Sequence, residues 1–233
     1  MNLHSSASAN PDRPDWKGID TVLLDMDGTI LDLNYDNYVW NTLVPYAFAE
    51  GANISIEDAR DRMRSRMMEK RGSIDFYRFN HWSEFCNIDM IDLHEQATHL
   101  IQLRPGTDRF IHWLRQQNRQ ILIATNADRK SFDIKQTQID LKGLADEVIS
   151  SHDYNCPKES QTFWDTLHDR YAYDPARTLF IDDNEPVLEA AAKAGIGHLL
   201  CVNRPDSNQP KRENLRYPSF DHFEEIMPLE SDR

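Results

Sequence analysis

Short apolar runs recur along the chain, and most are apolar at consecutive rather than alternate positions. They are TVLL (21–24), ILIAT (121–125), EVIS (147–150), TLFI (178–181) and HLLCV (198–202). Such runs suit strands that are buried on both faces, as in a parallel sheet covered by helices. Stretches with helical character separate several of the runs, at 107–118, 161–172 and 185–195. The alternation predicts an α/β protein with a doubly wound, mainly parallel sheet of five or more strands and helices on both faces.

The pattern breaks between the first and second runs, because residues 34–103 contain no convincing strand. The helices expected there cover 37–50, 55–70 (with Ser55 as N-cap), 75–86 and 90–103. They indicate a helical cap inserted into the core. We therefore expect four parts: a disordered tail (1–16), a Rossmann-like catalytic core (17–33 and 104–205), the cap (34–103) and a C-terminal extension (206–233) with one short helix near FDHFEEIM.

Charge and composition exclude several classes of function. The 233 residues include 26 Lys and Arg against 39 Asp and Glu, a net charge of −13, which argues against a nucleic acid polymer or an anionic membrane as partner. The three cysteines (Cys86, Cys156, Cys201) lack CxxC spacing, so we expect neither a disulfide framework nor a zinc site. The first residues lack the apolar region of a signal peptide, and no run approaches the roughly 20 apolar residues of a membrane span. A cytoplasmic protein is expected.

Polar clusters lie at or after four of the predicted strands, where ligands meet a doubly wound sheet. They are DMDGT (25–29), Thr125 with Asn126, Lys158 in the loop YNCPKES, and Asp182 with Asp183. Converging carboxylates from Asp25, Asp27 and Asp182 would repel one another unless a hard divalent cation lay among them. Mg²⁺, which prefers oxygen ligands, fits that description.

The same clusters suit a phosphate monoester. Lys158, the Thr125 hydroxyl and backbone N–H groups around Gly28 and Asn126 can hold phosphate oxygens. Gly28 also lets the backbone approach the anion and turn sharply, because it has no Cβ.

Two carboxyl groups can then divide the chemistry. Asp25 can attack the phosphorus and form an aspartyl-phosphate, which splits one hard hydrolysis into two easier steps. Asp27 can protonate the departing alkoxide and afterwards draw a proton from the attacking water.

The motifs DMDGT, ATN, the loop Lys158 and FIDDNEPVLEAA resemble, in order, the four signature motifs of the haloacid dehalogenase-like hydrolases, which are mostly phosphatases. The insertion after the first strand is similar to the helical cap of that family. The resemblance implies that Asp25 is the nucleophile and Asp27 the general acid and base. It further implies that Mg²⁺ is bound by Asp25, the Asp27 backbone carbonyl and Asp182, with Asp183 in support. Thr125 and Lys158 would bind phosphate.

A closer likeness, to the bacterial GMP/IMP 5′-nucleotidases of this family, is carried by DTVLLDMDGTILDLNYDNYVWNTLVP, HWSEF and RTLFIDDNEPVLEAAAKAGI. It implies hydrolysis of a small phosphorylated substrate, a purine nucleoside 5′-monophosphate. The alternatives are a phosphatase or phosphomutase for small sugar or organic phosphates, and a non-catalytic module that binds a phosphorylated ligand. In the cap, Tyr38 is a candidate for stacking on the base. Arg64 is a candidate for reaching into the cleft, and the alternative is that it belongs to a solvated basic face of its helix.

Overall fold

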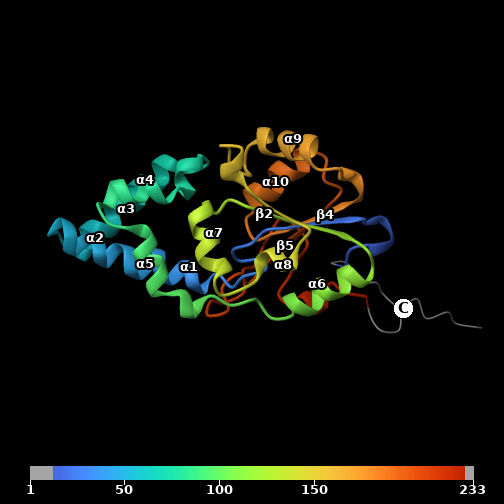
Figure 1. The fold of residues 1–233 in the computed structure, drawn as a ribbon, viewed down its shortest axis with the longest axis horizontal. Coiled ribbons are helices and arrows are strands. Elements are labelled where there is room, and N and C mark those ends of the chain that lie inside the picture. The colour runs from blue at the N-terminus through green and yellow to red at the C-terminus, as the bar shows by residue number, and fades with distance from the viewer. Residues whose placement is uncertain (1–12, 229–233) are drawn as a thin grey trace, which may run out of the picture.

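The computed structural model describes residues 13–228, which form a six-stranded sheet with helices on both faces (Figure 1). The strands are β1 (Thr21–Leu24), β2 (Gln120–Thr125), β3 (Glu147–Ser150), β4 (Thr178–Asp182), β5 (His198–Val202) and β6 (Ser219–Phe220). All neighbouring pairs are parallel, in the order β3-β2-β1-β4-β5-β6. The predicted fold class is confirmed, and the five strands expected from the apolar runs all form.

Two helical layers cover the sheet. The helices of the core are α6 (Thr107–Gln116), α7 (Arg129–Gln136), α8 (Leu141–Leu144), α9 (Gln161–Arg170) and α10 (Glu185–Lys193). Along β1, Val22 and Leu24 pack with α6, α7 and α8, whereas Leu23 packs with α9 and α10 on the other face. Both faces of the strand are therefore buried, which explains its continuous apolar sequence.

The two ends of the described chain pack against the core. The tail expected over 1–16 falls largely on residues 1–12, outside the described residues, but Trp16 is buried and its indole N–H donates to the Ile226 carbonyl at 2.7 Å. From the expected extension, β6 joins the sheet, and a 3-10 turn, η7 (Phe223–Glu225), carries the buried Phe223. The ordered core therefore begins before residue 17 and continues past residue 205.

The inserted segment folds as a helical cap beside the sheet (Figure 1). Its elements are α1 (Asn34–Tyr38), a π-helical turn η2 (Val39–Leu43), α2 (Val44–Ala52), α3 (Ile56–Lys70), a 3-10 turn η3 (Ile74–Tyr77), α4 (Phe79–Cys86), α5 (Met90–Gln96) and a 3-10 turn η4 (Thr98–Leu100). Ser55 caps α3, as predicted, by accepting the Asp58 N–H at 3.0 Å. The helix expected over 90–103 is shorter, because the chain tightens into η4 and then becomes extended near Leu103.

The cap has its own apolar core, and it also touches the sheet domain. Trp82 is buried edge-on against Trp40, with ring centroids 5.4 Å apart. Ile134 of α7 joins this cap cluster, so α7 is the core helix on which the cap rests. The two chain passages between core and cap lie side by side, because Leu31 and Leu103 form an antiparallel bridge.

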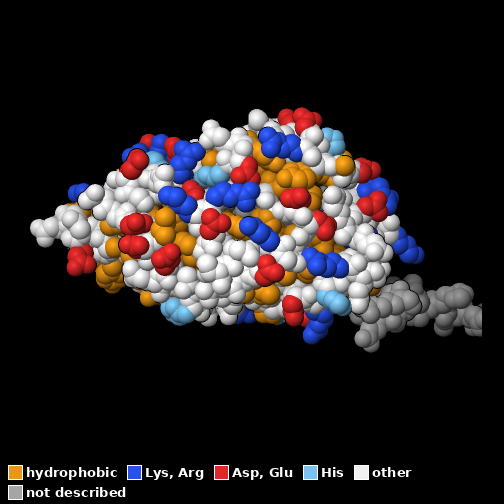
Figure 2. Space-filling view, in the orientation of Figure 1, with side chains coloured by type: hydrophobic (Ala, Val, Ile, Leu, Met, Phe, Trp, Pro, Cys, Tyr) orange, Lys and Arg blue, Asp and Glu red, His pale blue; other side chains and the backbone are white. Residues whose placement is uncertain are grey.

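Two further features of the described residues bear on partners. Acidic and basic side chains are interspersed over the face shown in Figure 2. None of the helices between residues 13 and 228 has the length and apolar character needed to cross a membrane.

Candidate active site

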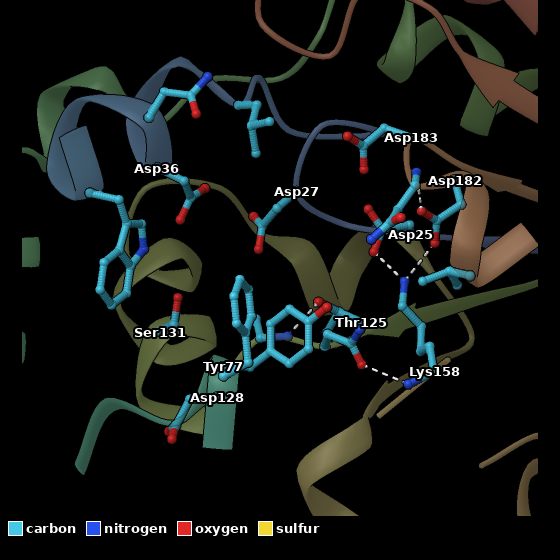
Figure 3. A pocket seen from close by; sticks show the side chains of 18 of the residues that line it. Asp25, Asp27, Asp36, Tyr77, Thr125, Asp128, Ser131, Lys158, Asp182 and Asp183 are labelled. Atoms are coloured by element: carbon cyan, nitrogen blue, oxygen red, sulfur yellow. Dashed lines mark hydrogen bonds and ion pairs between the residues drawn. The ribbon is translucent and has the colours of Figure 1, made fainter. Parts of the chain in front are cut away.

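A cavity of about 440 Å³ lies between the cap and the carboxyl ends of the central strands (Figure 3). The core side is lined by polar side chains, among them Asp25, Asp27, Thr125, Asn126, Lys158, Asp182 and Asp183. The cap side is lined by apolar and aromatic side chains: Trp40, Met67, Phe76, Tyr77, Phe79 and Trp82. A polar floor under an aromatic wall suits a ligand with one charged end and one flat, apolar end.

The strand order places the polar floor. The chain adds β2 on one side of β1 and β4 on the other, so a crevice opens at the carboxyl end of β1. Asp25 follows β1 directly, and its N–H donates to the Ile181 carbonyl at 2.9 Å. Asp182 ends β4 beside it. Residues 157 positions apart in the chain thus meet because their strands are neighbours.

Three carboxyl groups converge there. Asp25, Asp182 and Asp183 each offer an oxygen, and these oxygens lie within 4.8 Å of one another. Burial raises the pKa of Asp25 to about 7, with Lys158 acting in the opposite direction and Asp182 and Asp27 adding to the rise. Burial likewise raises the pKa of Asp182 to about 6 and that of Asp183 to about 7. A bound cation would offset the cost of burying three carboxylates together, and an all-oxygen set of this kind fits Mg²⁺.

Lys158 is the cation of this cluster. Its side chain is only 2% exposed, and its Nζ lies 2.5 Å from Asp25 Oδ1 and 2.7 Å from Asp182 Oδ2. Burial alone would lower the pKa of Lys158, but the Asp182 and Asp25 carboxylates outweigh burial and raise it. The lysine therefore stays charged, and one ammonium group faces three carboxyl groups.

Thr125 and Asn126 lie where the sequence places them. The Thr125 hydroxyl accepts the Ala127 N–H at 3.0 Å, which leaves its proton free to donate into the cavity. Asn126 accepts the Lys158 backbone N–H at 2.9 Å and donates to Glu159 at 2.9 Å. Asn126 therefore fixes the loop that carries Lys158.

Gly28 makes the sharp turn expected of it, but its backbone N–H is already used. Its N–H donates to the Leu31 carbonyl at 2.9 Å, so it is not a free donor for phosphate. Its φ is +89°, and a Cβ there would lie 3.0 Å from both Asp183 Cγ and Pro205 Cβ. Gly28 is required for the turn and for the close approach of Asp183.

The structure does not bring the two suggested cap contacts into the cavity. Tyr38 is 39% exposed and does not line the cavity, whereas its neighbours Asn37 and Trp40 do. The Arg64 side chain is 71% exposed and pairs with Asp61 one turn earlier on α3 at 3.0 Å. For Arg64 the solvated basic face is the observed arrangement, and Met67 of the same helix lines the cavity instead.

Tyr77 and Lys135 make contacts at the site that were not anticipated from the sequence. Tyr77 of the cap donates to Glu159 Oε1 at 2.6 Å, which links η3 to the loop of Lys158. Lys135 of α7 lies 2.7 Å from Asp27 Oδ1 and 2.9 Å from Asp36 Oδ1. No local motif marks Lys135, Glu159 or Tyr77, because each finds its partner only in the folded chain.

Comparison with known proteins agrees with this geometry. The family model for haloacid dehalogenase-like hydrolases matches residues 19–195. The GMP/IMP nucleotidase YrfG of Escherichia coli K12 is 33% identical over 213 residues, covering 91% of this chain and 96% of that protein, and the Shigella flexneri protein of the same name gives the same figures.

Solved structures share the fold. A HAD phosphatase from Thermococcus onnurineus superposes with a TM-score of 0.73 at 23% identity, covering 89% of this chain and 96% of that one. YfnB from Bacillus subtilis, solved with magnesium bound, gives a TM-score of 0.59 at 17% identity over 89% and 96% of the two chains. Given the family match and the relative at 33% identity, the chain belongs to the haloacid dehalogenase-like hydrolases.

Proposed function

We propose that this protein is a Mg²⁺-dependent phosphomonoesterase that hydrolyses purine nucleoside 5′-monophosphates such as GMP and IMP through an aspartyl-phosphate. The observation that carries the proposal is the convergence of Asp25, Asp182, Asp183 and Lys158 beneath an aromatic-walled cavity. The name of the relative with 33% identity, a GMP/IMP nucleotidase, supports the choice of substrate.

The first half of the reaction transfers the phosphoryl group. A carboxylate oxygen of Asp25 bonds to the phosphorus, and the bond from phosphorus to the ester oxygen breaks. Asp27, two residues on, donates a proton to the departing alkoxide, which leaves as the nucleoside. Lys158 and the Thr125 hydroxyl compensate the negative charge of the phosphoryl oxygens.

The second half regenerates the enzyme. A water molecule attacks the phosphorus of the aspartyl-phosphate and gives its proton to Asp27, now ionised. The bond between phosphorus and the Asp25 oxygen breaks, and inorganic phosphate leaves. Asp27 thus returns to its protonated form for the next cycle.

The carboxylates of Asp25 and Asp182 would hold Mg²⁺, together with the Asp27 backbone carbonyl that the family resemblance implies. Asp183, which offers an oxygen within 4.8 Å of theirs, would support that set. When bound, Mg²⁺ would neutralise the carboxylates and polarise the phosphoryl oxygens.

The cavity favours a substrate with an aromatic group. Its volume of about 440 Å³ lies within the range of small-molecule sites, and its cap side presents Trp40, Phe76 and Tyr77. Purine bases stack on aromatic side chains, and each stacked base is worth about 1–3 kcal/mol. A hexose phosphate has no aromatic ring to stack on the same wall.

The test is phosphate release from GMP, IMP, AMP, phosphoglycolate and hexose phosphates with Mg²⁺. We expect GMP and IMP to give the highest kcat/KM. Equal kcat/KM for the sugar phosphates would reject the nucleotide assignment and favour the alternative of a general phosphatase, and transfer to a second hydroxyl instead of phosphate release would indicate a phosphomutase.

An Asp25→Asn variant tests the nucleophile and the possibility of a non-catalytic binding module. We expect no turnover with the fold retained, because the amide cannot form the aspartyl-phosphate. The exposed Asp133→Asn on α7 is the matched control and should keep full activity. Phosphate release by Asp25→Asn at the wild-type rate would remove Asp25 from this role.

A further inference from the structure

Helix α7 carries a buried lysine that the proposed chemistry does not use. The Lys135 side chain is 1% exposed, and its Nζ lies 2.7 Å from Asp27 Oδ1 and 2.9 and 3.1 Å from the two oxygens of Asp36. The ammonium group also lies 5.3 Å from the centre of the Tyr35 ring. Lys135 thus joins three segments: α7 of the core, the loop after β1, and α1 of the cap.

A lysine in this position is costly as a purely structural element. Burying an ammonium group carries a large desolvation penalty before its ion pairs are counted, and an apolar side chain of similar size is often at least as stabilising. Lys158 is the other buried lysine that bridges two carboxyl groups at this site, and it contacts the proposed nucleophile Asp25. Lys135 makes the corresponding contact with Asp27.

The contact fixes one oxygen of the Asp27 carboxyl group and leaves the other available. Among the described residues, the hydrogen bond from Lys135 reaches Oδ1, and Oδ2 has no hydrogen-bond partner. Asp27 lines the cavity between Asp36 and Asp25 (Figure 3). A proton donor acts only when it lies within hydrogen-bond reach of the leaving oxygen, so a side chain free to rotate would be a poorer acid.

Asp36 fixes the lysine in turn. It lies on α1, the first helix of the cap, and both of its oxygens accept from Lys135. The ammonium group has one carboxyl group on each side. If the Asp27 side chain rotated away, Lys135 could follow it only by breaking its ion pair with Asp36. The ion pair with Asp36 therefore keeps the Lys135 ammonium group at a fixed distance from Asp27, in the loop after β1.

We propose that Lys135 is a positioning residue for Asp27: anchored by Asp36, its ammonium group holds one carboxyl oxygen of Asp27 so that the other faces the leaving group of the substrate. This inference rests on the proposed function, in which Asp27 protonates that leaving group.

The choice of ester separates positioning from mere structural support. The alkoxide released from GMP must be protonated as it leaves, whereas p-nitrophenolate leaves as a stable anion and needs little help from an acid. The constant to compare is kcat/KM, because it reports only the steps up to phosphoryl transfer to Asp25 and not the later hydrolysis, which is the same for both esters.

The experiment measures kcat/KM of Lys135→Met for GMP and for p-nitrophenyl phosphate. Loss of a positioned acid typically costs 10²–10⁴-fold, so we expect a loss of about 10²-fold for GMP and less than about threefold for p-nitrophenyl phosphate. Asp27→Asn should show the same preference on a larger scale. Lys130→Met, an exposed lysine on the same helix, is the control and should leave both constants unchanged.

Asp36→Asn is the second test of the positioning role. It decides between positioning and structural support if circular dichroism shows that Lys135→Met does not fold. It keeps the lysine but removes the negative charge and one of the two acceptor oxygens of its anchor, so it should lower kcat/KM for GMP more than for p-nitrophenyl phosphate. Equal losses for the two esters in the folded variant would overturn the inference and leave the proposed function standing. Hydrolysis of neither ester by the wild-type protein would overturn both.

Discussion

His94 shows how a single residue can make the stability of this fold depend on pH. It is buried in the cap, where its Nδ1 lies 3.1 Å from the Tyr35 hydroxyl and its Nε2 has no partner among the described residues. Burial, with Lys135 adding to it, lowers the pKa of His94 to about 3. The native protein therefore keeps this imidazole neutral where the unfolded chain would protonate it.

The consequence is a loss of stability in weak acid. Below about pH 6.5 the unfolded chain binds a proton at His94 that the native protein does not, so the free energy of unfolding falls by up to about 1.4 kcal/mol per unit as the pH falls towards 3. Between pH 7 and pH 5 we expect this residue to account for about 2 kcal/mol. Urea unfolding at pH 7 and at pH 5 measures this difference in the free energy of unfolding.

The His94→Gln variant should lose about that part of the pH dependence and keep a polar group near Tyr35. His112→Gln on α6 is the matched control, because His112 is exposed, and it should keep the full dependence. If the slope of the free energy against pH is the same in His94→Gln as in the wild type, burial of this imidazole is not the cause.

The residues of the site differ in how well the sequence predicts their place. Asp25, Thr125 and Asp182 were predicted together because each lies at the end of an apolar run, and parallel strands end at one edge. Lys135 was not predicted, because it lies in the middle of a helix and meets Asp27, 108 positions earlier, only through tertiary packing.

At the scale of single elements, the start of α3 offers a simple test of local stability. Ser55 accepts the Asp58 N–H at 3.0 Å and so satisfies one of the free donors at this helix end. Ser55→Ala should lower the free energy of unfolding by about 1 kcal/mol. Urea unfolding should detect the loss, and Ser65→Ala, further along the same helix, should not lower stability, because alanine is the better helix former.

The 3-10 turn η3 is the cap element that contacts the Lys158 loop. Tyr77→Phe removes the 2.6 Å hydrogen bond to Glu159 and keeps the aromatic wall. A net hydrogen bond to a charged group is worth about 1.5–3 kcal/mol. Its loss should loosen the cap wall over the cavity and weaken substrate binding, so we expect KM for GMP to rise about tenfold with little change in kcat. Steady-state kinetics with Tyr46→Phe, on the exposed side of the cap, provide the control. A lower kcat at constant KM would place Tyr77 in the chemical step instead.

Elements were predicted best where burial is uniform. The five longer strands follow from their apolar runs, whereas β6 has only two residues, too few for a recognisable pattern. In the cap, the helix expected over 37–50 is divided into α1, η2 and α2 over 34–52, because amphipathic spacing does not distinguish an α-helix from a local π-helical turn.

At the scale of the whole molecule, the acidic cluster should couple metal binding to global stability. Asp25, Asp182 and Asp183 lie close together and Lys158 pairs with only two of them, so binding of Mg²⁺ to the native protein would relieve their repulsion. A ligand at 100 times its Kd contributes about 2.7 kcal/mol. For a chain of this length that corresponds to a rise in Tm of about 5–10 °C, measurable by calorimetry.

Chelation with EDTA should abolish phosphate release, and added Mg²⁺ should restore it. In Asp182→Asn the rise in Tm with Mg²⁺ should disappear, while NaCl at the same ionic strength should have no comparable effect on either protein. A rise of equal size in Asp182→Asn would mean that the ion binds elsewhere.

The bridge between Leu31 and Leu103 has a consequence for how such enzymes diversify. Because the excursion of some seventy residues leaves and re-enters the sheet domain at adjacent points, it can be exchanged as a block without moving Asp25 or Asp182. A chimera that takes this block from a relative with another preference would inherit the new specificity while retaining the host's chemistry. The contacts that join the block to the sheet domain, among them Asp36 with Lys135 and Tyr77 with Glu159, would have to be matched to the graft.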